Sequence, residues 1–277
     1  MLTASVVVHK TPPETLSKAI HSLLQEPIER IYIVDNSPDN LLQKYSEIDS
    51  KISYIKTPNK GYGAAHNIAI KKAFELGADY HLIMNPDVYW EGKVLTRLMD
   101  NLKGNQQIGL IAPQLLYPDG SPQRSVLPNP TPFSLIKNRL IPFKSLKKPS
   151  LLPNSKNFTN SNNSNNSNYL NKLNKPNKPN KPNNLVYLNN QQYLLGAFML
   201  FRIDALKDIG LFDERFFLYP EDIDISRRMK KNWDVVYNPE VSVYHEYQRD
   251  SAKKLRMFII HCVNMIRYFN KWGWFTK

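Results

Sequence analysis

The sequence has few of the residues that would give it a disulfide framework, a membrane span or a leader peptide. Cys262 is the only cysteine among the 277 residues, which excludes an internal disulfide and a cysteine-based metal cluster and is typical of a reducing compartment. No run approaches the roughly twenty apolar residues that cross a bilayer. The chain enters the valine-rich run at 4–8 without a basic leader. These absences predict a cytoplasmic protein.

Acidic residues are missing from one long stretch of a basic chain. The formal net charge is +13, and residues 134–184 hold ten Lys or Arg and no Asp or Glu. A stretch of this kind can meet an anionic membrane surface, a nucleic acid or only solvent. We expect no nucleic-acid partner, because the excess charge lies in low-complexity sequence and no base-stacking motif accompanies it.

Composition divides the chain into parts. Residues 153–184 consist largely of Asn, Ser, Lys and Pro and include three successive Lys-Pro-Asn units. Such a stretch cannot bury enough apolar surface to offset the entropy of ordering it, so it predicts a disordered insertion. It separates residues 1–152 from residues 185–250, and residues 251–277 form a further segment.

Outside the insertion, short apolar runs alternate with helical patterns. This alternation predicts an α/β fold with a mostly parallel sheet and helices on both faces. The expected strands are 4–9, 30–34, 52–56, 80–84, 108–113, 193–202, 234–237 and 241–243. The expected helices include 64–76, 91–102, 203–208 and one that starts near Pro220.

Polar residues follow the first four predicted strands at the points where they end. They are His9 after the first strand, Asp35 after the second, the loop 59–63 after the third and residues 85–87 after the fourth. Each could be an ordinary turn, because Asp, Asn and Gly are turn formers. In open parallel sheets, however, ligands bind beyond the carboxyl ends of the strands. Together these residues indicate a nucleotide-type crevice.

The stretch 211–228 combines aromatic residues with five carboxylates. Acidic residues suit the first turn of a helix that begins near Pro220, because they face the positive end of the helix dipole. Asp224 lies four residues before Arg228, a favourable spacing for a helical ion pair. Asp222 has no cation at that spacing, which makes it a candidate general base. Helix capping remains an alternative for Asp222.

The tail from residue 252 onward has apolar residues on a helical repeat with basic residues around them. The apolar positions are Leu255, Phe258, Ile259, Cys262, Ile266 and Phe269. We expect an amphipathic helix packed on the domain, and an interfacial membrane helix is the alternative.

The order of these features resembles that of the family 2 inverting glycosyltransferases, especially the rhamnosyltransferase-like members that build bacterial surface polysaccharides. The resemblance runs from about residue 4 to residue 245, with the insertion excluded. The motifs that carry it are Val34-Asp35-Asn36-Ser37, Asn59-x-Gly61-x-Gly63-x-x-x-Asn67, Asn85-Pro86-Asp87, Gly196-Ala197-Phe198-Met199, Gly210 to Phe217, Glu221-Asp222-Ile223-Asp224 and His245.

The resemblance implies a GT-A fold with a Rossmann-like sheet and a nucleoside diphosphate sugar as donor. Residues 1–152 would be the donor-binding half, and residues 185–250 the acceptor-binding and catalytic half. The donor-binding residues would be His9, Asp35, Asn59, Gly61, Gly63, Asn67, Asn85 and Asp87. The acceptor-binding residues would be Gly196, Ala197, Tyr219 and Glu221.

The resemblance also implies a divalent cation, Mn²⁺ or Mg²⁺. Asp87 matches the second acid of the DxD metal motif, and His245 matches a third metal-contacting position. Asn85 stands where the motif has its first aspartate. An amide contributes less charge than a carboxylate, so we expect the metal to be held mainly through the diphosphate. Mn²⁺ suits an Asp/His pair somewhat better than Mg²⁺.

Asp222 matches the catalytic base of the family. As base it would take the proton of an acceptor hydroxyl while that oxygen attacks the anomeric carbon opposite the leaving group. The acceptor would be a saccharide, and a lipid-linked one would place the protein peripherally at the inner face of the membrane. The alternative is a noncatalytic nucleotide-sugar or saccharide-binding protein of the same fold, for which Asn85 is the sequence support.

Overall fold

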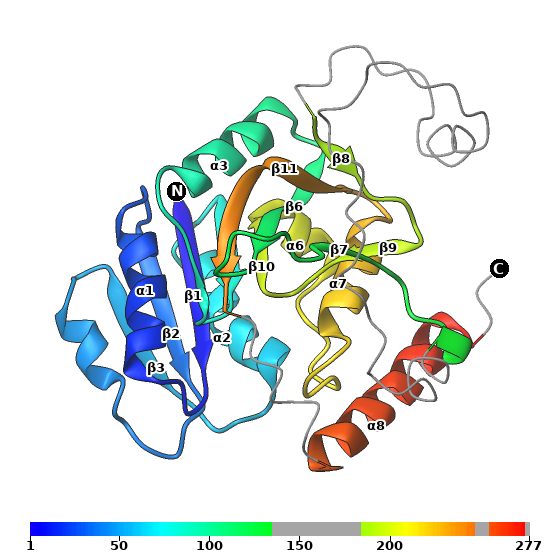
Figure 1. The fold of residues 1–277 in the computed structure, drawn as a ribbon, viewed down its shortest axis with the longest axis horizontal. Helices are drawn as coiled ribbons and strands as arrows, with labels where there is room; N and C mark the ends of the chain where they lie inside the picture. Colours follow the sequence, from blue (N-terminus) through cyan, green and yellow to red (C-terminus); the bar gives the residue numbers. More distant parts are fainter. Residues whose placement is uncertain (135–183, 247–254, 275–277) are drawn as a thin grey trace.

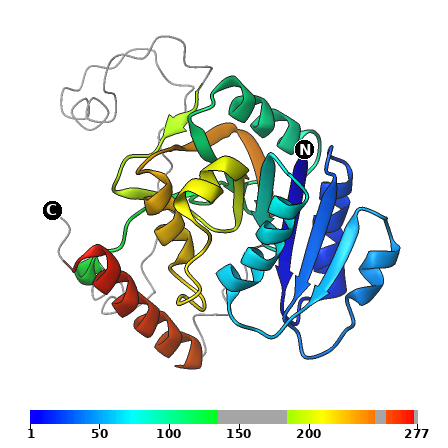
Figure 2. The same cartoon turned by 180° about the vertical axis from the view of Figure 1, so that it is seen from behind.

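The computed structural model describes residues 1–134, 184–246 and 255–274 (Figures 1 and 2). The predicted disordered insertion at 153–184 lies almost entirely outside these residues. The strands are β1 (Leu2–Val8), β2 (Arg30–Asp35), β3 (Ile52–Lys56), β4 (Tyr80–Met84), β5 (Val88–Tyr89), β6 (Ile108–Leu116), β7 (Val126–Pro128), β8 (Val186–Tyr187), β9 (Gln192–Leu194), β10 (Phe198–Arg202) and β11 (Asp234–His245). The helices are α1 (Pro13–Leu24), the 3-10 helix η1 (Gln43–Glu47), α2 (Tyr62–Glu75), α3 (Val94–Gly104), α6 (Ile203–Ile209), α7 (Glu221–Met229) and α8 (Leu255–Trp272).

A nine-stranded sheet forms the centre of the molecule, in the order β3-β2-β1-β4-β10-β6-β11-β5 with β8 paired to β11. Strands β1 to β4 are parallel, as are β6 and β11, whereas β10, β5 and β8 run antiparallel to their neighbours. The predicted α/β fold with a mostly parallel sheet is therefore confirmed. Because β6 lies between β10 and β11, the segments before and after the insertion share one sheet.

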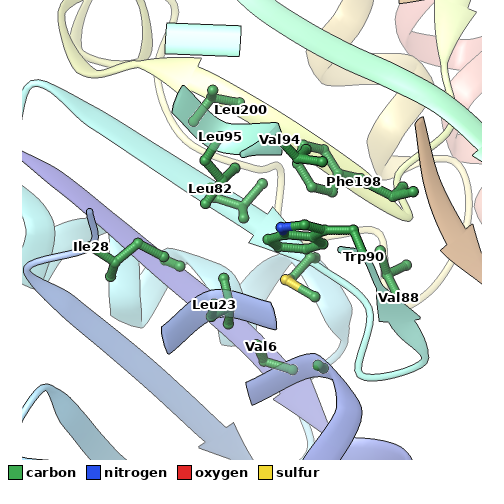
Figure 3. Packing of buried hydrophobic residues seen from close by; sticks show 14 of the residues in the cluster. Val6, Leu23, Ile28, Leu82, Val88, Trp90, Val94, Leu95, Phe198 and Leu200 are labelled. Atoms are coloured by element: carbon green, nitrogen blue, oxygen red, sulfur yellow. The ribbon is translucent and has the colours of Figure 1, made fainter. Parts of the chain in front are cut away.

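Side chains alternate between the two faces of this sheet, and each face has its own core. On one face, Val6, Leu82 and Phe198 pack with side chains of α1 and α3 around Trp90 (Figure 3). On the other face, α2, α6 and α7 cover side chains such as Ile83 of β4. Leu82 and Ile83 are neighbours in β4 and point to opposite faces, as the period of two in a strand requires.

Three predicted strands were wrong in their extent. The run 193–202 is two strands, β9 and β10, separated at Leu195–Ala197. The interruption arises because Leu195 N–H donates to the carbonyl of Ser125 and Gly196 N–H donates to Asp222 Oδ2. Conversely, the two short strands predicted at 234–237 and 241–243 are one strand, β11, with a shift of register between residues 238 and 242. A bulge there lets pairing continue past Pro239.

The predicted helix at 91–102 begins three residues later than expected, at Val94. The buried carboxylate of Glu26 caps this end, because it accepts hydrogen bonds from Leu95 N–H at 2.8 Å and from Thr96 N–H at 3.3 Å. A carboxylate at a helix N-terminus satisfies amide groups that have no partner within the helix. Glu26 lies about seventy residues away in sequence, so no local pattern reveals this cap.

Helix α8 is the last described element, and it lies along the segment 213–229 (Figure 1). Met265, Tyr268 and Phe269 of α8 form a core with Phe216 and Ile223. Asn264 Nδ2 donates to the carbonyl of Leu218 at 2.9 Å. The prediction of a helix packed on the domain is thus correct for this face of α8. Within the described ranges, no helix is both long and apolar enough to cross a membrane.

Candidate active site

The carboxyl ends of β1, β2 and β3 border a cleft of about 710 Å³. It is lined by His9, Lys10, Asn36, Ser37, Pro38, Lys56, Thr57, Pro58, Asn59 and Phe217. Two predicted donor-binding residues, His9 and Asn59, are therefore brought together here. Of the described residues that line the cleft, two are lysines and none is acidic, which suits a ligand that carries negative charge.

Asp35 lies beneath this cleft, with a fully buried side chain. Its Oδ1 accepts a hydrogen bond from Ser37 N–H at 2.7 Å, and its Oδ2 accepts one from the Tyr54 hydroxyl at 2.7 Å. The ammonium of Lys56 is 3.7 Å away. Asp35 thus fixes the loop that forms one wall of the cleft, and its contact with a donor base stays a prediction.

The glycines of the 59–67 motif contact the stretch 212–217. Gly61 has φ +114°, and a Cβ on it would lie 2.4 Å from the carbonyl oxygen of Phe217. A Cβ on Gly63 would lie 2.8 Å from Cβ of Phe212. Real Cβ atoms do not approach this closely, and few residues other than glycine adopt that φ. Both glycines therefore let the start of α2 pack directly against the stretch that precedes α7.

Asn67 fastens the same two segments together. Its Nδ2 donates to the Phe212 carbonyl at 2.9 Å and to Glu214 Oε1 at 3.0 Å, and its Oδ1 accepts from Phe212 N–H at 3.0 Å. Both hydrogens of the amide group are used, and the side chain is buried. A contact of Asn67 with a donor stays a prediction. In the structure its side chain joins α2 to the stretch 212–214.

Tyr62, which the sequence did not single out, links α2 to the candidate base. The Tyr62 hydroxyl donates to the Gly196 carbonyl at 2.8 Å, and Gly196 N–H donates to Asp222 Oδ2 at 3.1 Å. Ile223 N–H donates to Asp222 Oδ1 at 2.8 Å. A Cβ on Gly196 would lie 3.0 Å from Cβ of Asp222, so a larger residue would displace the carboxylate. The peptide of Gly196 therefore sets the position of Asp222.

Burial raises the pKa of both Glu221 and Asp222, and the shift is larger for Glu221 because the charge of Asp222 adds to it. The hydrogen bond from Gly196 N–H opposes the shift at Asp222. Glu221 is 5% exposed, and its Oε2 has no hydrogen-bond partner among the described residues. Burial is the main cause of the raised pKa of Tyr62, and the charges of Glu221, Asp222 and Asp87 raise it further. The three carboxylates thus converge on one tyrosine.

Asp224 has the structural role that its spacing predicts. Its Oδ2 accepts a hydrogen bond from Arg228 Nε at 2.9 Å, which confirms the helical ion pair. Its Oδ1 is 2.7 Å from the Lys271 ammonium and accepts from Trp272 Nε1 at 2.8 Å. Asp224 therefore also ties α7 to α8.

The predicted metal residues Asp87 and His245 lie together, with His245 Nε2 3.6 Å from Asp87 Oδ1. Gln123 Nε2 donates to the His245 carbonyl at 2.7 Å, so its Oε1 faces His245 Nδ1 at 2.9 Å and accepts a hydrogen bond from the Nδ1–H group. This tautomer leaves the Nε2 lone pair toward Asp87. Burial lowers the pKa of His245 to about 4, which keeps the ring neutral, as a metal ligand requires. Two electron-pair donors at this distance suit a shared cation.

Asn85 is joined through its backbone to the loop Leu195–Ala197, since its N–H donates to the Ala197 carbonyl at 2.9 Å. This bond holds the 85–87 turn, and hence Asp87, against Gly196 and Ala197. Within the described ranges, no group of three or more His, Cys, Asp or Glu side chains could hold a metal. Asp87 and His245 therefore fit an ion that takes its remaining ligands from a diphosphate and water.

The remaining predicted acceptor residues lie near α7. Tyr219 is 37% exposed, and its ring lies edge-on to that of His261 on α8, 5.6 Å between centroids. Ala197 is buried, so its backbone carbonyl rather than its methyl group shapes the site. Their contacts with an acceptor stay predictions, as does that of Glu221.

Comparison with known proteins identifies the family. The sequence profile described as "Glycosyl transferase family 2" matches residues 4–210. The chain belongs to glycosyl transferase family 2. It is also 26% identical, over 261 residues, to N-acetylglucosaminyl-diphospho-decaprenol L-rhamnosyltransferase of Mycobacterium tuberculosis, covering 90% of this chain and 77% of that protein. The prediction that the protein is a glycosyltransferase is thereby confirmed.

Solved structures share the fold. GalNAc-T7, solved with UDP, GalNAc and Mn²⁺, superposes with a TM-score of 0.64 at 12% identity over 97% of this family 2 chain. The mannosyltransferase PcManGT of Pyrobaculum calidifontis, with GDP-Man and Mn²⁺, gives 0.55 at 12% identity over 96%. Staphylococcus aureus TarS gives 0.54 at 16% identity over 89%. The chain spans only 47%, 64% and 36% of these three structures, respectively. The GT-A fold is confirmed.

Sequence reasoning missed Tyr62 and Gln123. Tyr62 lies between the two glycines of the 59–63 loop, where it reads as one more loop residue. Gln123 follows the turn at Asp119-Gly120 and lies far from both His245 and Asp87 in sequence. Both act through backbone carbonyls or a second side chain, and such contacts leave no motif.

Proposed function

We propose that this family 2 enzyme is a metal-dependent inverting glycosyltransferase. It moves a hexose, with rhamnose the first candidate, from a nucleoside diphosphate to a saccharide in surface polysaccharide synthesis. The observation that carries the proposal is the setting of Asp222. Its carboxylate is held by two backbone N–H groups and, among the described residues, pairs with no lysine or arginine. It is partly exposed, beside the turn that bears Asp87.

The chemistry follows from this setting. Asp222 accepts the proton of an acceptor hydroxyl as the oxygen forms a bond to the anomeric carbon. The bond from that carbon to the phosphate oxygen breaks, and the nucleoside diphosphate leaves with the electron pair. A single displacement from the opposite face inverts the anomeric configuration. The raised pKa of Asp222 suits this role, because a base with a higher pKa holds the proton more strongly.

Asp87 and His245 are the residues that would hold the divalent cation, Mn²⁺ or Mg²⁺. Such an ion neutralises the charge that develops on the departing diphosphate. Two homologous folds were solved with Mn²⁺, which supports the proposal without fixing the ion here. His245 would contribute a neutral ligand in a tautomer held by Gln123, and Asp87 would contribute the negative charge.

The acceptor in this proposal is lipid-linked. The support is the mycobacterial relative, whose name specifies a diphospho-decaprenol acceptor and L-rhamnose. An acceptor of that kind is met at a membrane surface, so we include peripheral membrane contact in the proposal.

Donor turnover tests the proposal. The protein is incubated with a panel of nucleoside diphosphate sugars, an acceptor preparation and Mn²⁺ or Mg²⁺, and release of nucleoside diphosphate is measured. We expect metal-dependent release with one donor class and product of inverted configuration by NMR. Retention of configuration, or release that chelation leaves unchanged, would contradict it. Donor binding in calorimetry without turnover across donors and acceptors would favour the noncatalytic alternative, which Asn85 alone supports.

A further inference from the structure

Helix α8 has a second apolar face, opposite the one that packs on the domain. Ile259, Val263 and Ile266 are 54%, 41% and 49% exposed. Their spacing of four and then three residues places them on one side of a helix. Trp274, just beyond the helix, is 42% exposed. Residues Ile259, Val263 and Ile266 are called the α8 stripe below.

Single exposed apolar side chains are normal on protein surfaces and need no explanation. Elsewhere in the described chain the exposed large apolar residues are scattered, as Leu41, Ile48 and Leu76 illustrate with 68%, 59% and 41% exposure. The α8 stripe differs because its three members are aligned on one rigid element. The opposite face of α8 holds the buried residues Met265 and Tyr268, so packing of the helix on the domain does not account for the stripe.

Charge indicates what the stripe meets. The sequence from 251 to 277 contains six Lys or Arg and no Asp or Glu. Among the basic residues of this segment that the structure describes, Arg267 lies next to the stripe and is exposed. An apolar face with an exposed arginine beside it, in a segment without acidic residues and with an exposed tryptophan near its end, is the pattern of a helix that lies in the interface of an anionic bilayer.

We propose that the α8 stripe docks the enzyme on an anionic membrane surface, with α8 lying in the plane of the interface. This inference rests on the proposed function, because docking on the membrane would bring Asp222 to a lipid-linked acceptor. The geometry agrees, because the inner face of α8 contacts the stretch that leads to the base. Asn264 binds the Leu218 carbonyl, and Arg267 Nη1 donates to the Arg215 carbonyl at 2.6 Å.

Vesicle binding tests the proposal with the full-length protein. The vesicles are phosphatidylcholine alone or phosphatidylcholine mixed with phosphatidylglycerol, and bound protein is measured by co-sedimentation. The test variant combines Ile259→Gln, Val263→Gln and Ile266→Gln. The matched control combines Leu41→Gln, Ile48→Gln and Leu76→Gln, which removes the same kind of exposed apolar surface far from α8.

We expect wild type and control to bind the anionic vesicles alike, and the stripe variant to bind them at least about tenfold more weakly. Wild-type binding should weaken as salt is raised, because salt screens the contribution of the cations. Equal loss in the control variant, or no wild-type binding to the anionic vesicles, would overturn the proposal. So would a wild-type dimer that the stripe variant dissociates while vesicle binding stays unchanged, since a second copy would then cover the stripe.

The readout separates this inference from the proposed function. Nucleotide-sugar binding by calorimetry, without vesicles, should be the same for wild type and the stripe variant. If vesicle binding behaves as expected but no donor is bound or turned over, the proposed function fails and the docking surface stands. If donors are turned over but the protein does not bind vesicles, only the docking proposal is contradicted.

Discussion

The two sides of the candidate site are built in different ways. The proposed donor side consists of loops that follow the parallel strands β1 to β3. Its residues His9 and Asn59 line one cleft because β1 and β3 flank β2 and end at the same edge of the sheet. The proposed catalytic side is the stretch 211–229, which two helices distant in sequence hold in place. Asn67 of α2 clamps its first part, and Lys271 and Trp272 of α8 bind Asp224. The donor side is fixed by topology, and the catalytic side by long-range side-chain contacts.

The largest expected effect separates chemistry from binding. Asp222→Asn removes the base but keeps a hydrogen-bond acceptor near Gly196 N–H, so we expect the transfer rate to fall by roughly 10²- to 10⁴-fold. Donor affinity, measured by calorimetry, should stay close to wild type because the donor side is untouched. The matched control is Asp204→Asn, which removes an exposed carboxylate on α6 whose ion-pair partner among the described residues is Lys207, and it should transfer normally. Normal transfer by Asp222→Asn would remove Asp222 from its role.

A clamp variant tests whether the catalytic side depends on α2. Asn67→Ala leaves the buried N–H and carbonyl of Phe212 without their partner, which we expect to lower the free energy of unfolding by about 2 kcal/mol. Asn59→Ala, in the same motif but at the cleft, should change it by less than about 0.5 kcal/mol. Denaturant unfolding measures both. Equal effects of the two substitutions would show that the distinction between the two sides is wrong at this motif.

A variant of Gln123 tests whether a residue outside every sequence motif affects metal binding by Asp87 and His245. Gln123→Leu removes the acceptor that fixes the tautomer of His245, so we expect metal affinity in the presence of nucleoside diphosphate to weaken about 10- to 100-fold. A Mn²⁺ titration of the transfer rate measures this effect. Gln107→Leu, at the exposed start of the β6 region, is the control. An unchanged metal requirement in Gln123→Leu would argue against His245 as a ligand.

The smallest expected effect distinguishes two half-buried tyrosine residues, one on each side. Tyr62→Phe frees the Gly196 carbonyl and so loosens the N–H that holds Asp222, and we expect kcat to fall about three- to tenfold. A weaker bond from Gly196 raises the pKa of Asp222 further. Because the base must be deprotonated, the decline of kcat toward low pH should therefore begin at a higher pH than in wild type.

Tyr54→Phe is the counterpart on the donor side, since it removes the hydroxyl that donates to Asp35 Oδ2. We expect it to raise the KM for the donor and to leave the acidic limb of the kcat profile where it is in wild type. A pH–rate profile for each variant makes the comparison. If Tyr54→Phe also shifts the acidic limb, the two sides are electrostatically coupled and our separation of them is too strict.

Local pattern was sufficient for most elements. The strands at 52–56 and 80–84 have the predicted bounds, and the ion pair between Asp224 and Arg228 follows from helical spacing alone. Prediction from local pattern was wrong where residues distant in sequence form contacts. At Gly196, hydrogen bonds with Tyr62 and Asp222 interrupt a run that the sequence predicts as one strand. The motif residues Gly61, Gly63 and Asn67 were identified, but their contacts with 212–217 were not.

The sequence by itself determined the α/β fold, the family and the candidate base. These depend on periodicity, on motif order and on the absence of a helical partner for Asp222, all of which are local properties of the chain. Only the tertiary structure decided that Gln123 orients His245, that Glu26 caps α3, and that α8 keeps an exposed stripe after packing. The physical reason is that a hydrogen bond or a buried face is completed by whichever group folding brings near, and separation along the chain does not limit that choice.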